Sequence, residues 1–252
     1  MSDWNPEKYL QFKNQRTQPA KDLAARLLES SPGKIVDIGC GPGNSTAILE
    51  EMFPRAAVLG VDSSERMIDS AKANYKDISF AVCSAEEIKG SFDLLFSNAC
   101  FQWIPNHEKL IPSLMQKLNP NGYLAVQMPM NQDEPLFRLI KEAVSESKWN
   151  FKNEQLERND VLSPEEYFNI LSHCSSSFDM WETVYYHALP SHKQLIDWVE
   201  STRLRPYLSV LNDDDKLLFK QELIDKAAKI YRPTVSGEVI LKFRRFFFVA
   251  RR

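Results

Sequence analysis

Apolar positions along the chain recur with two different spacings, and the alternation between them predicts an α/β protein. Short runs of aliphatic residues indicate buried strands, whereas apolar residues three or four positions apart indicate one face of a helix. The strands expected on this basis are residues 35–38, 57–62, 78–82, 92–98, 123–128, 178–189 and 237–249. Helical patterns separate the first five strands, which is typical of a doubly wound, mostly parallel sheet.

A glycine-rich turn follows the first of these strands. The segment Val36-Asp37-Ile38-Gly39-Cys40-Gly41-Pro42-Gly43 closes the apolar run, and polar residues then lead into the next helix. Glycine at alternate positions lets the backbone turn tightly and lets a ligand approach the main chain. In an open α/β sheet, ligands bind at loops that follow the carboxyl ends of strands. We therefore expect this loop to bind a cofactor.

The spacing of the three glycines argues against a dinucleotide. The dinucleotide fingerprint has its third glycine one position later, where this chain has Asn44. Asp37 brings a carboxylate beside the loop, which repels a pyrophosphate but suits a cofactor with ammonium and sulfonium groups. S-adenosylmethionine fits that description.

Residues 36–43 also resemble motif I of the class I S-adenosylmethionine-dependent methyltransferases. The resemblance implies a Rossmann-like sheet of seven strands, in which the last strand returns antiparallel between the fifth and the sixth. The order of the predicted strands permits that arrangement. The resemblance also implies S-adenosyl-L-methionine as the cofactor and S-adenosyl-L-homocysteine as the product.

Several residues near this loop are candidates for binding the cofactor. Asp62 ends the second predicted strand, where a carboxylate is suited to accept hydrogen bonds from the ribose hydroxyls of a nucleoside. Met67 is placed to reach an adenine face, with core packing as an equal alternative, and residues 83–88 resemble the family's adenine-contact loop. Many family members have Asp at the position of Ser84. The expected cofactor contacts are Trp4, Tyr9, Arg16, Asp37, Gly39, Gly41, Asp62, Ser63, Met67, Ser84, Ala85, Glu86, Asn98 and Trp103.

We expect residues 1–252 to form one domain. Residues 1–30 form an N-terminal arm and helix, with the helix over 19–29, and residues 31–130 form the cofactor-binding half. Residues 190–234 have a helical pattern between the last two strands and the composition of a substrate lid. Further helices are expected at 46–52, from 63 onward, and at 110–118, 134–147 and 163–172, with a turn at 119–122.

Composition and charge narrow the class of partner. A net charge of -3 gives no basic footprint for nucleic acid, which favours a small-molecule substrate. The N-terminal residues lack a signal segment, and no apolar run is long enough to span a membrane, so a cytoplasmic protein is expected. The four cysteines and four histidines show none of the usual metal-ligand spacings. We expect no metal, no membrane and no obligate protein partner.

Other segments resemble a narrower group within the methyltransferase family. They are residues 1–6, 102–103, 124–129, 185–187, 190–192, 196–199 and 204–206. This resemblance implies methyl transfer to a carboxylate of trans-aconitate or a similar small polycarboxylic acid, which forms a monomethyl ester.

Hydrogen-bond donors gather in the expected lid and in the strands that flank it. They include Tyr185, Tyr186, His187, Arg203, Arg205, Tyr207, Arg244 and Arg245. Arginine can hold a carboxylate through two parallel hydrogen bonds, and Arg205 is the first choice for that role. The alternative is that several of these arginines pair with acidic side chains. The expected substrate contacts are Gln102, Trp103, Tyr185, Tyr186, His187, Arg205, Tyr207 and Arg244.

No catalytic residue is expected, because a carboxylate with a pKa of about 4 is already ionised at neutral pH and needs no general base. Rate enhancement then comes from proximity and orientation. The alternatives are a methyltransferase for another small acid or a phenol, and a non-catalytic cofactor-binding scaffold. A dehydrogenase is disfavoured by Asn44 and Asp37.

Overall fold

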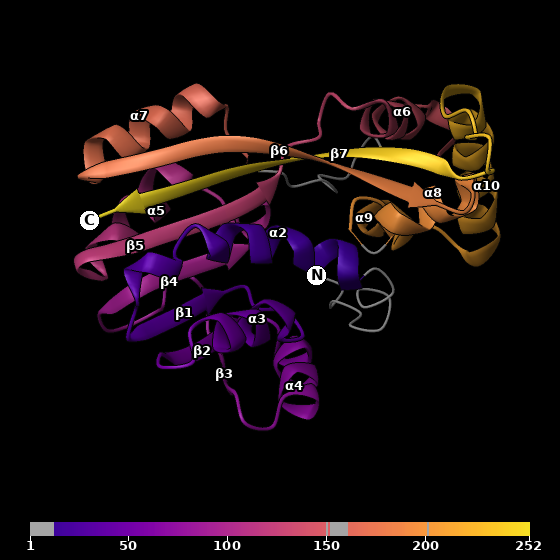
Figure 1. Cartoon of the computed structure of the whole chain (residues 1–252). Helices are drawn as coiled ribbons and strands as arrows, with labels where there is room; N and C mark the ends of the chain where they lie inside the picture. Colours follow the sequence, from indigo (N-terminus) through magenta and orange to yellow (C-terminus); the bar gives the residue numbers. More distant parts are fainter. Residues whose placement is uncertain (1–12, 150, 152–160, 201) are drawn as a thin grey trace.

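The computed structural model describes residues 13–149, 151, 161–200 and 202–252. Within them, one seven-stranded sheet runs through the molecule in the order β3-β2-β1-β4-β5-β7-β6 (Figure 1). The strands are β1 (Lys34–Ile38), β2 (Ala57–Asp62), β3 (Ser79–Val82), β4 (Phe92–Asn98), β5 (Leu118–Pro129), β6 (Ser177–Leu189) and β7 (Val239–Arg251).

The pairing of the strands confirms the predicted fold class. Strands β1 to β5 pair in parallel, and β7 lies antiparallel between β5 and β6. The register places Val126 of β5 opposite Phe248 of β7, and Tyr185 of β6 opposite Phe243 of β7. The carboxyl ends of β1, β2, β4 and β5 therefore meet at one edge, where the crossover loops gather.

Helices cover both faces of the sheet. They are α2 (Lys13–Ala25), α3 (Asn44–Met52), α4 (Glu65–Asn74), α5 (His107–Gln116), α6 (Pro135–Val144), α7 (Pro164–Cys174), α8 (His192–Glu200), α9 (Arg205–Leu208) and α10 (Asp213–Ile230). Short 3₁₀ turns are η1 (Leu28–Ser30), η2 (Phe101–Trp103) and η3 (Ser147–Trp149). In Figure 1, α2 and α3 lie on the opposite face of the sheet from α5 and α7, while α6, α8, α9 and α10 gather around one end of β6 and β7.

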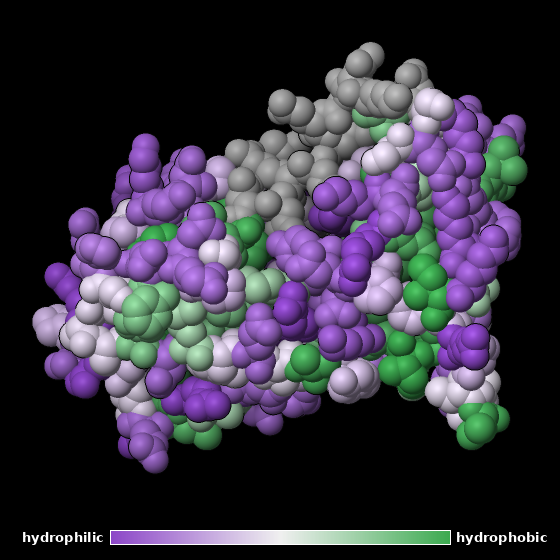
Figure 2. Space-filling view, turned by 90° about the horizontal axis from the view of Figure 1, so that it is seen from above, coloured by the Kyte–Doolittle hydropathy of each residue, from purple (hydrophilic) through white to green (hydrophobic). Residues whose placement is uncertain are grey.

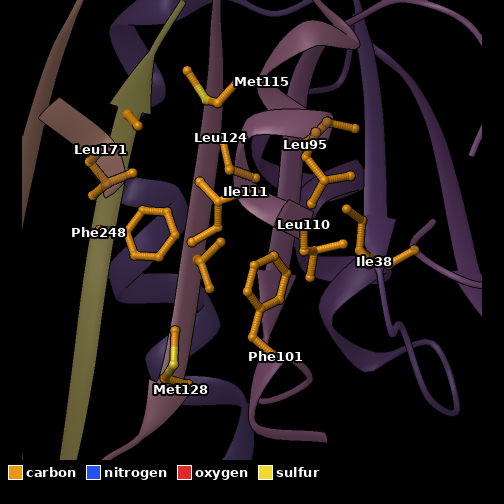
Figure 3. Close-up of a cluster of buried hydrophobic side chains, with 14 of the residues drawn as sticks. Ile38, Leu95, Phe101, Leu110, Ile111, Met115, Leu124, Met128, Leu171 and Phe248 are labelled. Atoms are coloured by element: carbon orange, nitrogen blue, oxygen red, sulfur yellow. The ribbon is translucent and has the colours of Figure 1, made fainter. Parts of the chain in front are cut away.

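The buried apolar residues form separate cores on the two faces. One core packs α5 and α7 against the sheet through residues such as Ile111, Leu124 and Phe248, as Figure 3 shows. The opposite core packs α2 and α3 against Ile35 and Phe96. These cores hold the strand ends in fixed positions, because side chains at native packing density cannot shift without opening cavities.

A further core lies where α6, α8, α9 and α10 surround the ends of β6 and β7. It includes Leu136, Trp198 and Leu223, all of which are buried. Polar residues dominate much of the face seen in Figure 2, with smaller apolar patches between them. No helix in the described residues combines the length and the apolarity required to cross a membrane.

The boundaries of two predicted elements were wrong. The turn expected at 119–122 is part of β5, which begins at Leu118 and is irregular opposite Phe92 and Leu94. The amide of Asn119 donates to Asp93 at 2.7 Å, and this contact with β4 keeps the segment in the sheet. The first helix was expected to begin at Pro19, whereas α2 already begins at Lys13.

A buried hydrogen-bond network anchors the turn η2 that follows β4. His107 Nε2 donates to the Phe101 carbonyl at 2.9 Å, and its Nδ1 lies 2.7 Å from the Tyr167 hydroxyl. That hydroxyl also contacts the Met128 sulfur at 3.2 Å. His107 and Tyr167 are both fully or almost fully buried. The network therefore ties η2 to α5, α7 and β5 at once.

Replacing His107 by leucine should lower the free energy of unfolding by about 1–3 kcal/mol, because the Phe101 carbonyl and the Tyr167 hydroxyl each lose one buried hydrogen bond. Denaturant unfolding at constant pH measures this change. His173→Leu is the matched control, since His173 is exposed and hydrogen-bonds to the Asn169 carbonyl of its own helix. Equal effects of the two substitutions would contradict the anchoring role.

Candidate functional site

The glycine loop turns through three residues with positive φ. Gly39, Gly41 and Gly43 have φ values of 70°, 53° and 92°. A Cβ at position 39 would lie 2.2 Å from the Cys100 sulfur, so only glycine fits there. A Cβ at position 41 would meet no atom within 4 Å, so the backbone at Gly41 faces open space. The loop thus packs tightly at Gly39 and exposes its main chain at Gly41.

Asp62 connects this loop to the end of β2. One of its carboxylate oxygens accepts a hydrogen bond from Gly41 N, and the other accepts one from Ser64 N, both at 2.9 Å. Ser64 also caps α4, where its side chain accepts from Met67 N. The carboxylate is therefore oriented by the main chain of two loops and lies between them.

One cavity of about 360 Å³ opens at the carboxyl edge of the sheet. Its first half is lined by residues of the loops after β1, β2, β3 and β4, namely Ile38, Gly39, Gly41, Asp62, Ser63, Met67, Cys83, Ser84, Ala85, Glu86, Ala99, Cys100, Gln102, Trp103, Ile104 and Pro105. Its second half is lined by Pro129, Asn131, Gln132, Phe137, Trp198, Val199, Thr202, Arg203, Pro206, Phe243 and Arg245. The cavity therefore extends from the glycine loop to the helical end of the molecule.

Charge is divided between the two halves. The acidic side chains Asp62 and Glu86 belong to the first half, whereas Arg203 and Arg245 belong to the second. The Arg245 guanidinium lies over the Phe243 ring at 4.6 Å, and Arg203 lies over Phe137 at 5.8 Å. The cavity therefore suits a ligand with a positive group at one end and an anion at the other.

A family model described as a methyltransferase domain matches residues 29–203. Trans-aconitate 2-methyltransferase of Escherichia coli strain K12 is 40% identical over 254 residues, which cover 100% of this chain and 99% of that protein. The chain belongs to the methyltransferase domain family.

Solved structures share the fold of this methyltransferase. The YcgJ protein from Bacillus subtilis superposes with a TM-score of 0.57 at 13% identity, covering 92% of this chain and 98% of that one. Phosphoethanolamine N-methyltransferase 2 of Haemonchus contortus, solved with S-adenosyl-L-methionine, gives a TM-score of 0.54 at 20% identity. That match covers 92% of this methyltransferase and 52% of the other chain. At these identities the likeness concerns the fold alone.

Most of the residues expected to bind the cofactor lie on the first half of the cavity. They are Gly39, Gly41, Asp62, Ser63, Met67, Ser84, Ala85, Glu86 and Trp103. Asn98 instead lines a second, much smaller cavity beside Thr17 and Gly39. Trp4 and Tyr9 lie outside the described residues, as does the side chain of Arg16.

Asp37 does not line the large cavity. It is fully buried behind the glycine loop, where Ser45 and Thr46 hydroxyls donate to its Oδ2 at 2.6 and 2.7 Å. Its Oδ1 has no hydrogen-bond partner within the described part of the chain. Burial raises the pKa of the carboxyl to about 6, against the effect of the two hydroxyls and with a further rise from Asp62.

The expected acceptor residues are only partly brought together. Gln102 and Trp103 line the cavity, whereas Tyr185, Tyr186, His187, Arg205, Tyr207 and Arg244 do not. On β6, Tyr186 is 68% exposed and Tyr185 donates to Asp22 of α2 at 2.5 Å. Arg244 donates to the Met130 carbonyl, because neighbouring side chains of a strand point to opposite faces. Arg245 of the same strand therefore reaches the cavity in its place.

At the helical end of the molecule, too, a nearby arginine lines the cavity in place of the expected one. Arg203, two positions before Arg205, lines the cavity, while Tyr207 is buried with its ring against Phe151. Arg205 is the first residue of the short helix α9, which begins after Leu204. The arginine that lines the cavity at this end is therefore Arg203, in the turn between α8 and α9.

His187 supports the cavity wall from behind. Its ring stacks on Trp198 at 4.6 Å and lies 6.1 Å from Phe243, two residues that do line the cavity. Burial, assisted by the positive charge of Arg245, lowers the pKa of His187 to about 4. The imidazole is therefore neutral at physiological pH and has no positive charge that could attract an anionic ligand.

Sequence reasoning missed several cavity residues in the second half, among them Asn131, Gln132, Phe137, Thr202 and Phe243. The alternation along β7 was a usable signal, since Phe243 and Arg245 occupy positions of the same parity. No group of three potential metal ligands occurs among the described residues.

Replacing Asp37 by asparagine should change how stability depends on pH. Between about pH 4 and 6 the folded wild type binds more protons at Asp37 than the unfolded chain does, so its stability falls as the pH rises. The asparagine variant lacks this fall, which amounts to about 3 kcal/mol for a pKa raised from 3.8 to about 6.

Unfolding of the ligand-free protein at pH 4 and at pH 7.5 measures the effect. Between pH 4 and pH 7.5, the free energy of unfolding of the variant should rise by about 2–3 kcal/mol relative to that of wild type. A change in stability that the substitution causes equally at both pH values does not affect this difference. Asp179→Asn, at an exposed position of β6, is the control for loss of a carboxylate. Parallel pH profiles of Asp37→Asn and wild type would refute the buried titration.

Proposed function

We propose that this methyltransferase transfers the methyl group of S-adenosyl-L-methionine to a carboxylate of trans-aconitate or a similar small polycarboxylic acid. The product of the acceptor is a monomethyl ester, and S-adenosyl-L-homocysteine is the other product. The observation that carries the proposal is the division of charge in the cavity, with Asp62 and Glu86 in one half and Arg203 and Arg245 in the other. The full-length similarity to trans-aconitate 2-methyltransferase supports the choice of acceptor.

The residues of the first half fit the proposed cofactor. The open space in front of Gly41 lets a nucleoside approach the backbone, and Asp62 offers a carboxylate for its ribose hydroxyls. Met67 and Ala85 are buried and supply apolar surface for an adenine ring. Asp37, buried behind the glycine loop, adds a further carboxyl group to this side of the cavity without lining it, which favours a ligand with a cationic group.

When bound, the cofactor supplies an electrophilic methyl group on a positively charged sulfur. The chain needs no residue to remove a proton, because the acceptor carboxylate is ionised at neutral pH. Arg203 and Arg245 hold further carboxylates of the acceptor through charge-assisted hydrogen bonds. Phe137, Trp198 and Phe243 exclude water from the same half of the cavity, which strengthens these interactions.

The two halves of the cavity also determine how the bound acceptor is oriented. With its other carboxylates on the arginines, one carboxylate points toward the loops after β1 and β4, where Gln102 and Trp103 line the cavity. Holding the reacting atoms in line accounts for most of the rate enhancement in favourable cases, about 7–11 kcal/mol. The proposal therefore assigns catalysis to binding and orientation.

Replacing Asp62 by alanine should weaken the binding of S-adenosyl-L-methionine and S-adenosyl-L-homocysteine at least tenfold, or about 1.5–3 kcal/mol per lost hydrogen bond to the carboxylate. Isothermal titration calorimetry measures both affinities. Asp69→Ala, on the exposed side of α4, is the matched control. Unchanged affinity in a folded Asp62 variant would exclude the ribose role.

Replacing Arg245 by glutamine should lower kcat/KM for trans-aconitate by roughly 10- to 200-fold, mainly through KM, while the affinity for the cofactor changes little. Steady-state assays with a panel of mono-, di- and tricarboxylic acids test this. Arg251→Gln is the control, since Arg251 lies on the same strand and donates to Asn121 at the surface. Arg205→Gln is measured alongside, and a large loss there without one at Arg245 would reverse the assignment.

A further inference from the structure

Gln127 is a buried amide at the carboxyl end of β5. Its side chain is fully buried, and its register neighbours are Asn98 of β4 and Phe247 of β7. A polar side chain in such a place destabilises the fold unless its hydrogen bonds are satisfied. Only one side of the amide meets this condition, because Nε2 has no partner among the described residues. The residue therefore calls for an explanation beyond packing.

The other side of the amide contacts Arg245. Gln127 Oε1 accepts a hydrogen bond from Arg245 Nη1 at 3.3 Å. Arg245 is 4% exposed, lies over the Phe243 ring and lines the acceptor half of the cavity. An aromatic face and the amide oxygen of a neighbouring strand thus both help to hold the guanidinium in place.

The chemistry of the amide determines what this contact does. An amide oxygen orients a guanidinium without cancelling its positive charge. A glutamate at the same place would form a buried ion pair with Arg245, and such a pair is held strongly in a low-dielectric site. An aliphatic residue of similar size would leave the guanidinium without this orienting contact.

We propose that Gln127 is a positioning residue for acceptor recognition, which fixes the Arg245 guanidinium at the cavity wall while preserving its charge for a carboxylate of the acceptor. The inference rests on the proposed function, since it concerns the acceptor half of the same cavity. It also makes residue 127 a determinant of acceptor charge. With glutamine there the cavity selects polycarboxylates, and with glutamate it loses that preference.

The test compares Gln127→Glu and Gln127→Leu with wild type. Binding of trans-aconitate to protein loaded with S-adenosyl-L-homocysteine is measured by calorimetry, and kcat and KM are measured with S-adenosyl-L-methionine. Gln127→Glu should weaken trans-aconitate binding about tenfold or more, and Gln127→Leu by about three- to tenfold. Turnover at saturation should stay within about threefold and cofactor affinity within about twofold.

Two controls separate positioning from a structural effect. Gln116→Glu makes the same chemical change at an exposed position of α5 and should leave all values as in wild type. In an Arg245→Gln background, Gln127→Glu should change acceptor binding by less than about twofold, because the residue through which it acts is gone. An equal loss in both backgrounds would overturn the proposal.

The remaining outcomes are also decisive. If wild type methylates trans-aconitate and a folded Gln127→Glu protein binds it as tightly, the inference falls and the proposed function stands. If Gln127→Glu does not fold, unchanged acceptor binding by Gln127→Leu overturns the inference in the same way. If wild type neither binds nor methylates trans-aconitate, the proposed function and this inference fall together.

Discussion

The close contact between Gly39 and Cys100 is the constraint on which the site depends. The loop after β1 and the loop after β4 pack so tightly that no side chain fits at position 39. This contact sets the distance between the glycine loop and η2, which carries Gln102 and Trp103. The hydrogen bond from Gly41 to Asp62 then fixes the loop after β2 relative to both. Three crossover loops thereby form one rigid wall.

The fold and the first half of the cavity were predictable because they depend on local sequence. Strand β2 was expected at residues 57–62 and is observed there, since a short aliphatic run ending in an acid specifies it. Gly39, Gly41, Asp62 and Ala85 lie on one cavity because parallel strands bring their carboxyl ends to one edge. The order of the strands is therefore enough to place these residues at the same cavity.

The second half of the cavity was harder to predict because it depends on which way side chains point. Arg244 and Arg245 are indistinguishable by residue type, and only the strand register separates the one that contacts Met130 from the one that lines the cavity. Asp37 was expected to act on the cofactor directly, yet it lies behind the loop and is held by Ser45 and Thr46. The residue type identifies a carboxyl group at this position, but it does not indicate that the group is buried.

The place of β7 in the sheet has a consequence for the order of folding. Strand β6 touches the sheet only through β7, which follows it in the chain by the whole of the helical segment α8 to α10. Neither strand can complete the sheet before the chain has closed a long loop, which is slow because its entropy is lost before the contacts form. Because Phe243 and Arg245 belong to β7, the second half of the cavity cannot form before this strand has paired. A chain in which only β1 to β5 have paired would already contain the glycine loop and Asp62 but would lack Phe243 and Arg245 in the cavity wall.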